Sequence, residues 1–447
     1  MSDNNTNIQG GAGNPDGIKT GSTVNQNAEK IINFERAENV TIVNTPVSET
    51  RTYNLYLCRK LTEALAGINI AKVVDFLDQI DEKDKANWES EPTYTSPAFD
   101  NIITNFGILG LLLRKVIASG LETARSSNDR EYIKYCVETA LRTVQLISYS
   151  FISKLWDYKK VNKCEISSDQ VKVLTRFFNS EIEFTITRYL ELLNILINIF
   201  DAQKIDYPFK EFNKDCLKED GNFVKACTSL SDINKNITEP SQGNLSNSKV
   251  AEKELTEVLS TLIFLVNYKM VSVREISYES FKNKGDQYLH SYNFLGENFD
   301  ISKKQKMNYL PKYKYDSLPV SSDAIFIYNG NNQKYREGLN LFPFIIDYNA
   351  LTGFVVPRIC FYTVVKKEEK IIIYADINKP TKNKEDTDNS NDPSQVVIQF
   401  NEEVENALKA NTENDITSIK ESPEKHDSLQ LNTVYNLFQS AKNEILG

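Results

Sequence analysis

Apolar residues recur at helical spacing from about residue 50 to residue 270, which predicts a series of amphipathic helices. Two positions carry helix-start signals. Ser96 is a predicted N-cap, because Pro97 follows it at the first helical position. Ser167 and Gln170 fit a capping box. Residues 204–247 lose the periodicity. The predicted helices run over residues 52–67, 70–80, 96–124, 128–158, 167–200 and 248–266, and together they predict an α-helical bundle.

After residue 270 the pattern changes to short runs rich in Ile, Val, Phe and Tyr, which is typical of β-strands. Residues 366–369 form a turn between two of these runs and predict a β-hairpin. A short helix is expected at 401–410. The predicted strands lie at 288–295, 324–328, 339–346, 358–365, 370–377 and 396–400. The expected fold class is therefore α+β, mainly an α-helical bundle followed by a small mixed β-sheet domain.

These patterns divide the chain into four predicted segments. Residues 1–49 are rich in small polar residues and predict a flexible tail with a short β ribbon at 30–34 and 39–43. The remaining segments are the helical bundle at 50–270, the small α+β domain at 271–410, and a linker with a terminal helix at 411–447.

Composition narrows the classes of function. The 447 residues include 52 Lys and Arg against 61 Asp and Glu, a formal net charge of −9, and 40% are hydrophobic. The apolar share is enough to bury a core. The acidic balance argues against a general binder of nucleic acid or of anionic membranes, because phosphate contacts need clustered Lys and Arg. No apolar run approaches the roughly 18–20 residues of a bilayer span, so we expect a cytoplasmic protein without membrane contact.

Cysteines and histidines limit the chemistry further. The six cysteines are spread along the chain without a Cys-x-x-Cys pair, whereas a zinc site or a disulfide scaffold would cluster them. We expect reduced, buried thiols and no metal or other cofactor. His290 and His426 are the two histidines. A Cys360–His290 nucleophile pair is one alternative, but the run around Cys360 is apolar and favours an inert core thiol.

One candidate for catalysis is a set of charged residues in the second half of the chain. Glu368 and Lys370 have the Glu-x-Lys spacing of restriction-type nucleases, and Asp347 lies upstream near a predicted strand end. Two acidic groups would hold Mg²⁺ while Lys370 stabilised developing charge. Solvated turn charges are the favoured interpretation of Glu368. Asp347 and Asn349 are expected to cap or turn the backbone, with ligand binding as the alternative.

A second candidate is a stretch that interleaves cations and aromatics. Positive charge and stacking rings are what single-stranded nucleic acid requires, whereas a Lys-rich edge strand that resists aggregation would show the same pattern. The residues are Lys303, Lys304, Lys306, Tyr309, Lys312, Tyr313, Lys314 and Tyr315.

Two short strings resemble segments of known proteins. Residues 25–33, Asn-Gln-Asn-Ala-Glu-Lys-Ile-Ile-Asn, resemble short N-terminal segments in bacterial conflict-system proteins, those built around signalling ATPases, proteases and their effectors. Residues 339–362, from the Leu-Asn-Leu-Phe-Pro-Phe-Ile-Ile-Asp string to Ile-Cys-Phe-Tyr, resemble a recurring C-terminal segment of uncharacterised bacterial proteins of such systems. Neither string is a catalytic motif, so the resemblance carries over no active-site residue.

The sequence therefore favours a non-enzymatic protein-interaction module, an adaptor, regulator or protease target in a bacterial defence or stress-response assembly. A protein partner is expected, and the polar stretches at 378–394 and 411–428 would suit proteolytic control. Two alternatives stay open. One is a metal-dependent nuclease that uses Asp347, Glu368 and Lys370, and the other is a nucleic-acid sensor that uses the Lys/Tyr stretch.

Overall fold

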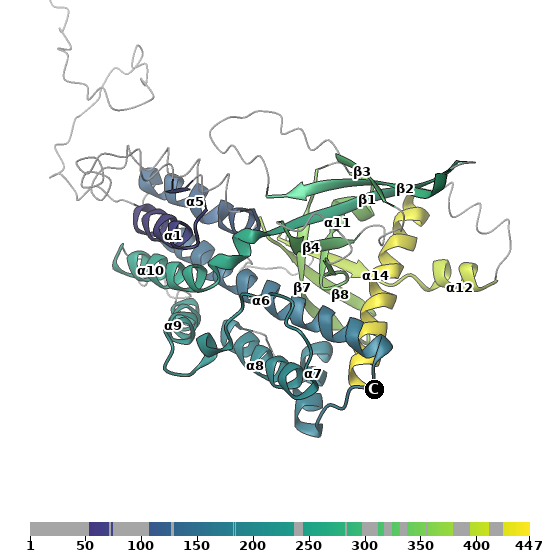
Figure 1. Cartoon of the computed structure of the whole chain (residues 1–447), viewed down its shortest axis with the longest axis horizontal. Helices are drawn as coiled ribbons and strands as arrows, with labels where there is room; N and C mark the ends of the chain where they lie inside the picture. The colour runs from purple at the N-terminus through teal and green to yellow at the C-terminus, as the bar shows by residue number, and fades with distance from the viewer. Residues whose placement is uncertain are drawn as a thin grey trace, which may run out of the picture. The chain divides into compact units, whose positions relative to one another are not determined.

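The structure is a computed structural model (Figure 1). The described residues are 53–70, 73–74, 107–126, 129–181, 183, 185–236, 245–281, 284–296, 312–316, 324–330, 338–354, 356–378, 394–410 and 423–447. The predicted tail and β ribbon within 1–49, most of the predicted helix at 70–80, and the predicted helix start at Ser96 lie outside them.

The first part of the described chain is helical, as the apolar periodicity predicts. Its long helix α6 contacts α5, α8, α9 and α10 and is buried on more than one side, so it lies at the centre of the helical layer. The elements are α1 (Leu55–Gly67), α5 (Ile108–Ser126), α6 (Asp129–Val161), α7 (Ser168–Asn179), α8 (Ile186–Gln203), η2 (Lys214–Leu217), α9 (Asn222–Asn236), α10 (Leu245–Thr261) and η4 (Ile263–Asn267).

The predicted capping box is confirmed at the start of α7. The Ser167 side chain accepts a hydrogen bond from the Gln170 backbone N–H, and the Gln170 side chain accepts one from the Ser167 N–H. The single helix predicted over 167–200 is wrong, because α7 ends at Asn179 and α8 begins at Ile186. Ser180 adopts a left-handed conformation at φ 52°, and its Oγ accepts a hydrogen bond from the Val365 N–H at 2.8 Å. The end of α7 is thus closed by local backbone hydrogen bonds to the Phe177 and Arg176 carbonyls, and β7 contacts it at the same residue.

The loss of helical periodicity inferred for residues 204–247 is wrong for Asn222–Asn236, which form helix α9. Its buried apolar residues are Phe223, Ala226, Cys227 and Leu230, at helical spacing, with polar residues between them. The stripe packs against α8 and α10. Packing of this narrow apolar stripe against neighbouring helices therefore stabilises α9, although the residues around the stripe are polar.

Two antiparallel sheets follow the helices. In the first, five strands lie in the order β3-β2-β1-β4-β5, and in the second, four lie in the order β6-β7-β8-β9. Every described strand pair is antiparallel, from β1 with β2 to β8 with β9. The strands are β1 (Tyr268–Phe281), β2 (Lys284–Leu295), β3 (Lys312–Asp316), β4 (Ile325–Asn329), β5 (Leu339–Asn340), β6 (Ile345–Asp347), β7 (Ile359–Lys366), β8 (Ile371–Asp376) and β9 (Gln395–Gln399).

The α+β fold class is confirmed, and the predicted hairpin corresponds to β7 and β8. Within the described residues, the β-rich part contains two sheets, and both are antiparallel. The long strand β1 has no counterpart among the predicted strands, because its first residues follow directly on a helical pattern. Figure 1 shows β1 and β2 side by side along their length.

The C-terminal elements connect the helices to the second sheet. Helix α12 (Glu402–Ala410) follows β9, and helix α14 (Pro423–Leu446) packs against α6, α7 and β9. The Phe438 ring lies 4.7 Å from the Tyr362 ring of β7 and 5.7 Å from the Phe178 ring of α7. From α6, Tyr149 Oη donates a hydrogen bond to the Tyr362 carbonyl at 2.6 Å. Helices and second sheet therefore share one aromatic core.

Within the described residues, no helix has both the length and the apolar character that a membrane span requires.

Candidate functional site

A buried carboxylate marks the end of β6. Asp347 is fully buried, and its Oδ2 accepts hydrogen bonds from Ser272 Oγ at 2.7 Å and from Arg274 Nη2 at 2.6 Å. Its Oδ1 accepts from the backbone N–H groups of Arg358 at 2.8 Å and of Ala350 at 3.3 Å. The bond from Ala350 caps the short helix α11 (Tyr348–Leu351). The predicted capping role of Asp347 is confirmed.

A second ion pair lies beside the first. Arg358 Nε donates to Asp376 Oδ2 at 3.1 Å, and the Arg358 guanidinium lies over the Tyr348 ring, 5.6 Å from its centroid. Asp376 Oδ1 also accepts from the Asn378 N–H at 2.8 Å. Each of the two buried carboxylates therefore has an arginine as its counter-charge. We call Ser272, Arg274, Asp347, Arg358 and Asp376 the Asp347 cluster.

The cluster fixes a loop that projects apolar side chains. Arg274 Nη1 donates to the Phe354 carbonyl at 2.8 Å, and Asn349 Nδ2 donates to the Val356 carbonyl at 2.7 Å. The Phe354 N–H donates to the Asn349 carbonyl at 2.7 Å. The side chains of Phe354 and Val356 are nevertheless 64% and 51% exposed. We call the described residues 352–354 and 356–357 the docking loop. Hydrogen bonds hold the backbone of Phe354 and Val356, while the two large apolar side chains meet solvent.

The structure does not bring the three nuclease candidates together. Asp347 lies opposite Ile359 at one end of β7, whereas Glu368 follows Lys366 at the other end, about 23 Å away at about 3.3 Å per residue. Glu368 is exposed in the turn. Lys370 pairs with Glu402, and this contact raises the pKa of Lys370 and lowers that of Glu402. The three residues therefore do not form one site: Asp347 and Lys370 pair with other residues, and Glu368 lies in the exposed turn.

The Lys/Tyr stretch lies only partly within the described chain. Lys303, Lys304, Lys306 and Tyr309 are outside the described residues, as are the side chains of Lys312, Tyr313 and Tyr315. Strand β3 aligns Lys314 with His290 and Tyr313 with Ser291 on β2. The register confirms that this end of the stretch forms a strand at the edge of the first sheet.

The cysteines show no sign of a reactive thiol. None of the six forms a disulfide bond. Burial raises the pKa values of the Cys360, Cys58 and Cys136 thiols well above the ordinary value for cysteine. Burial also raises the pKa of Cys216 to about 11. Cys360 lies on β7 in the second sheet and His290 on β2 in the first. In the described part of the chain, no group of three or more His, Cys, Asp and Glu residues could hold a metal ion.

A second buried polar cluster, which the sequence does not reveal, lies among the helices. Glu252 of α10 accepts hydrogen bonds from the N–H groups of Asn54 and Leu57, each at 3.1 Å, and from Tyr132 Oη at 2.9 Å. A carboxylate from a distant helix therefore caps the start of α1. Burial raises the pKa of Glu252, against the lowering effect of these hydrogen bonds. Its contacts are all internal, so its role is structural.

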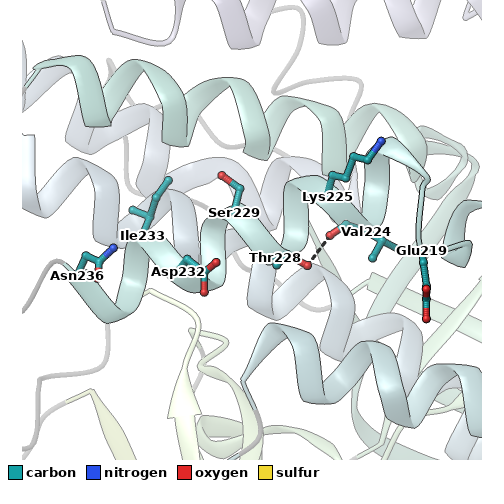
Figure 2. Close-up of a pocket in the computed structure, with 8 residues that line it drawn as sticks. All are labelled: Glu219, Val224, Lys225, Thr228, Ser229, Asp232, Ile233 and Asn236. Atoms are coloured by element: carbon teal, nitrogen blue, oxygen red, sulfur yellow. Dashed lines mark hydrogen bonds between the residues drawn. The ribbon is translucent and has the colours of Figure 1, made fainter.

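A surface depression of about 560 Å³ lies along α9. Figure 2 draws the residues that line it. Lys225 and Glu219 point away from each other, and Thr228 Oγ1 donates to the Val224 carbonyl of its own helix at 2.9 Å. Asp232 pairs with the exposed Lys235 at 3.0 Å. Among the described lining residues, the polar groups do not converge on one point, so the depression lacks the features of a ligand site.

The chain matches no protein-family model, no curated protein and no solved structure. Among the residues of the Asp347 cluster and the docking loop, Asp347 could be recognised from the sequence as an acidic residue at a strand end. Arg274, Phe354 and Val356 could not, because their roles depend on how β1 lies against α11.

Proposed function

We propose that this chain is a non-enzymatic protein-interaction module that binds a protein partner through the docking loop. The observation that carries the proposal is the pair of exposed side chains, Phe354 and Val356, on a backbone that hydrogen bonds from the Arg274 guanidinium and the Asn349 amide hold in place. Aromatic side chains are typical anchors of protein interfaces when they fill a pocket on the partner. The partner we expect therefore presents an apolar pocket.

Preorganisation is the physical reason for linking the loop to the Asp347 cluster. A loop that is already ordered loses less conformational entropy on binding, so more of the contact energy appears as affinity. Arg274 contributes to both parts, since its Nη2 pairs with Asp347 while its Nη1 binds the Phe354 carbonyl. The cluster would thus support binding without touching the partner.

The biological setting we propose is an assembly of bacterial defence or stress response in the cytoplasm. Its support is the resemblance of residues 25–33 and 339–362 to segments of conflict-system proteins. The second of these strings contains Asp347 and runs on both sides of the docking loop. Adaptor, regulator and protease target are the roles compatible with this setting.

The test is affinity purification of the tagged chain from its native host, with mass spectrometry and an absorbance check for nucleic acid. A double variant, Phe354→Ser with Val356→Ser, removes the anchors from exposed positions. The matched control is Val161→Ser, because Val161 is 80% exposed at the end of α6. We expect a stoichiometric protein with the wild type and the control and its loss with the double variant. A partner that the double variant retains, or a chain that carries nucleic acid alone, would contradict the proposal.

A further inference from the structure

Strand β9 forms one edge of the second sheet. It pairs with β8 on one side, and no described strand pairs with its other side. The Asp376 N–H donates to the Ser394 carbonyl at 2.8 Å, and the Phe400 N–H donates to the Lys370 carbonyl at 3.0 Å. Backbone groups alternate in direction along an antiparallel strand. Residues 394, 396, 398 and 400 therefore face β8, whereas Gln395, Val397 and Gln399 direct their N–H and C=O groups outward.

The sequence of this edge lacks three features that commonly protect an edge strand, namely charged side chains, proline and a bulge. Helix α14 contacts β9, and its Asn432 hydrogen-bonds the backbone of Asn401, two residues beyond the C-terminal end of the strand. β9 reads Gln-Val-Val-Ile-Gln, without charge, proline or glycine, and its register with β8 is continuous. Its outward N–H and C=O groups can pair with another strand by the same hydrogen bonds that join β9 to β8.

The sequence of β9 is complementary to itself. Antiparallel pairing of two copies about Val397 sets Val397 opposite Val397, Gln395 opposite Gln399, and Val396 opposite Ile398. Val397 and the two glutamines are the residues whose backbone groups face outward, so the centred register is also the one that forms hydrogen bonds. None of these pairs places like charges together, and the opposed glutamine amides can bond to each other.

An exposed apolar row ends at the same strand. Val364, Ile373 and Val397 lie opposite one another across β7, β8 and β9. Val364 is 38% exposed and Val397 53% exposed, and Ile373 between them is half-buried. Joining two β9 edges would set the two Val397 side chains together and continue the row across both copies. The outward backbone groups and the apolar row thus point to the same occupant.

We propose that a second copy of this chain docks on the outer edge of β9, in antiparallel pairing centred on Val397. The dimer has twofold symmetry, because the same patch serves both copies. A pairing of five residues per strand is small beside the ~1,200–2,000 Å² of a standard interface. The dimer should therefore be reversible and depend on concentration. This inference uses a different surface from the docking loop and is independent of the proposed function.

The test is sedimentation velocity of the full chain over a wide concentration range. Val397→Lys places two like charges side by side in the dimer, and Val397→Pro removes an outward N–H that β8 does not use. Val161→Lys is the control, since it adds the same charge at another exposed valine. We expect the wild type and the control to dimerise as concentration rises, and the dissociation constant to increase at least about tenfold in both Val397 variants.

Hydrogen exchange supplies a second readout that does not depend on a variant. The amides of Gln395, Val397 and Gln399 should exchange more slowly at concentrations where the wild type is dimeric. The circular dichroism spectrum of the whole chain should stay unchanged over the same concentrations. A wild type that is monomeric throughout would overturn the proposal. So would a dimer that persists in folded Val397→Lys and Val397→Pro, because it would then use another surface.

Discussion

At the scale of single residues, the Asp347 carboxylate has a donor set that accounts for its burial. Ser272 and Arg274 bind one oxygen, and two backbone N–H groups bind the other. A buried charge without such partners would be strongly unfavourable. An acidic residue at the end of a strand could be recognised from sequence as a cap. Its pairing with Arg274 could not, because the partner lies on a strand that the sequence pattern does not show.

Asp347→Asn should therefore destabilise the fold. The substitution leaves the largely buried Arg274 without its counter-charge. Breaking a buried pair in this way lowers the free energy of unfolding by about 3–5 kcal/mol. The measurement is urea unfolding followed by circular dichroism. The control is Asp232→Asn, which breaks an exposed ion pair with Lys235 and should cost at most about 1 kcal/mol. Equal losses in the two variants would contradict the structural role of the cluster.

Glu252 gives a prediction about pH. Burial raises its pKa in the folded state above the ordinary value of 4.5. The folded chain therefore binds this proton more tightly than the unfolded chain. The stabilisation is complete below pH 4.5 and is lost as the pH rises through the folded-state pKa. In the Glu252→Gln variant the side chain at this position cannot titrate. As the pH rises through the folded-state pKa of Glu252, the free energy of unfolding of the variant should therefore fall less than that of the wild type.

Urea unfolding at a series of pH values measures this difference. Glu191→Gln is the control, because Glu191 is exposed and pairs with Arg188 on the surface of α8. It should keep the pH dependence of the wild type. A Glu252→Gln profile parallel to the wild-type profile would show that Glu252 does not titrate in this range.

At the scale of elements, the sequence predicts helix and strand types better than their ends. Phe178, Ile182 and Ile186 keep helical spacing across the break between α7 and α8. The break lies at Ser180, whose backbone is left-handed and whose hydroxyl accepts the Val365 N–H of β7. Local periodicity cannot include a partner so distant in the chain. For the same reason β1 escapes prediction, since it begins where a helical pattern ends.

Helix α14 was predicted as a terminal helix, and its packing gives an element-scale test. Phe438 is fully buried against rings of α7 and β7. Phe438→Ala should lower the free energy of unfolding by about 3–5 kcal/mol, because it leaves a cavity between three elements. Asn443→Ala, at an exposed position of the same helix, should change it by less than about 0.5 kcal/mol. Thermal or urea unfolding checks both, and a small effect of Phe438→Ala would place α14 outside the core.

At the scale of the whole described unit, helices and second sheet share a core. Tyr149 of α6 hydrogen-bonds Tyr189 of α8 at 2.8 Å and the Tyr362 carbonyl of β7 at 2.6 Å. The change of apolar period near residue 270 is enough to predict the α+β class from the sequence. The shared core could not be predicted, because apolar periodicity shows which face of an element is buried and not which element covers it.

This core predicts cooperative unfolding. Far-ultraviolet circular dichroism, which reports mainly on the helices, and tyrosine fluorescence, which reports on the aromatic core, should give coincident urea transitions. Two separated transitions would show that the helices and the second sheet unfold as independent units.

The proposed function depends on the docking loop as the binding surface. The affinity of the chain for the partner recovered from the host tests this role. Calorimetric titration would compare the wild type, the Phe354→Ser/Val356→Ser variant and the Val161→Ser control. Loss of an anchor costs about 2 kcal/mol or more, so the double variant should bind at least about twentyfold more weakly while the control matches the wild type. Equal affinity of all three chains, with the double variant folded, would contradict the assignment of the docking loop as the binding surface.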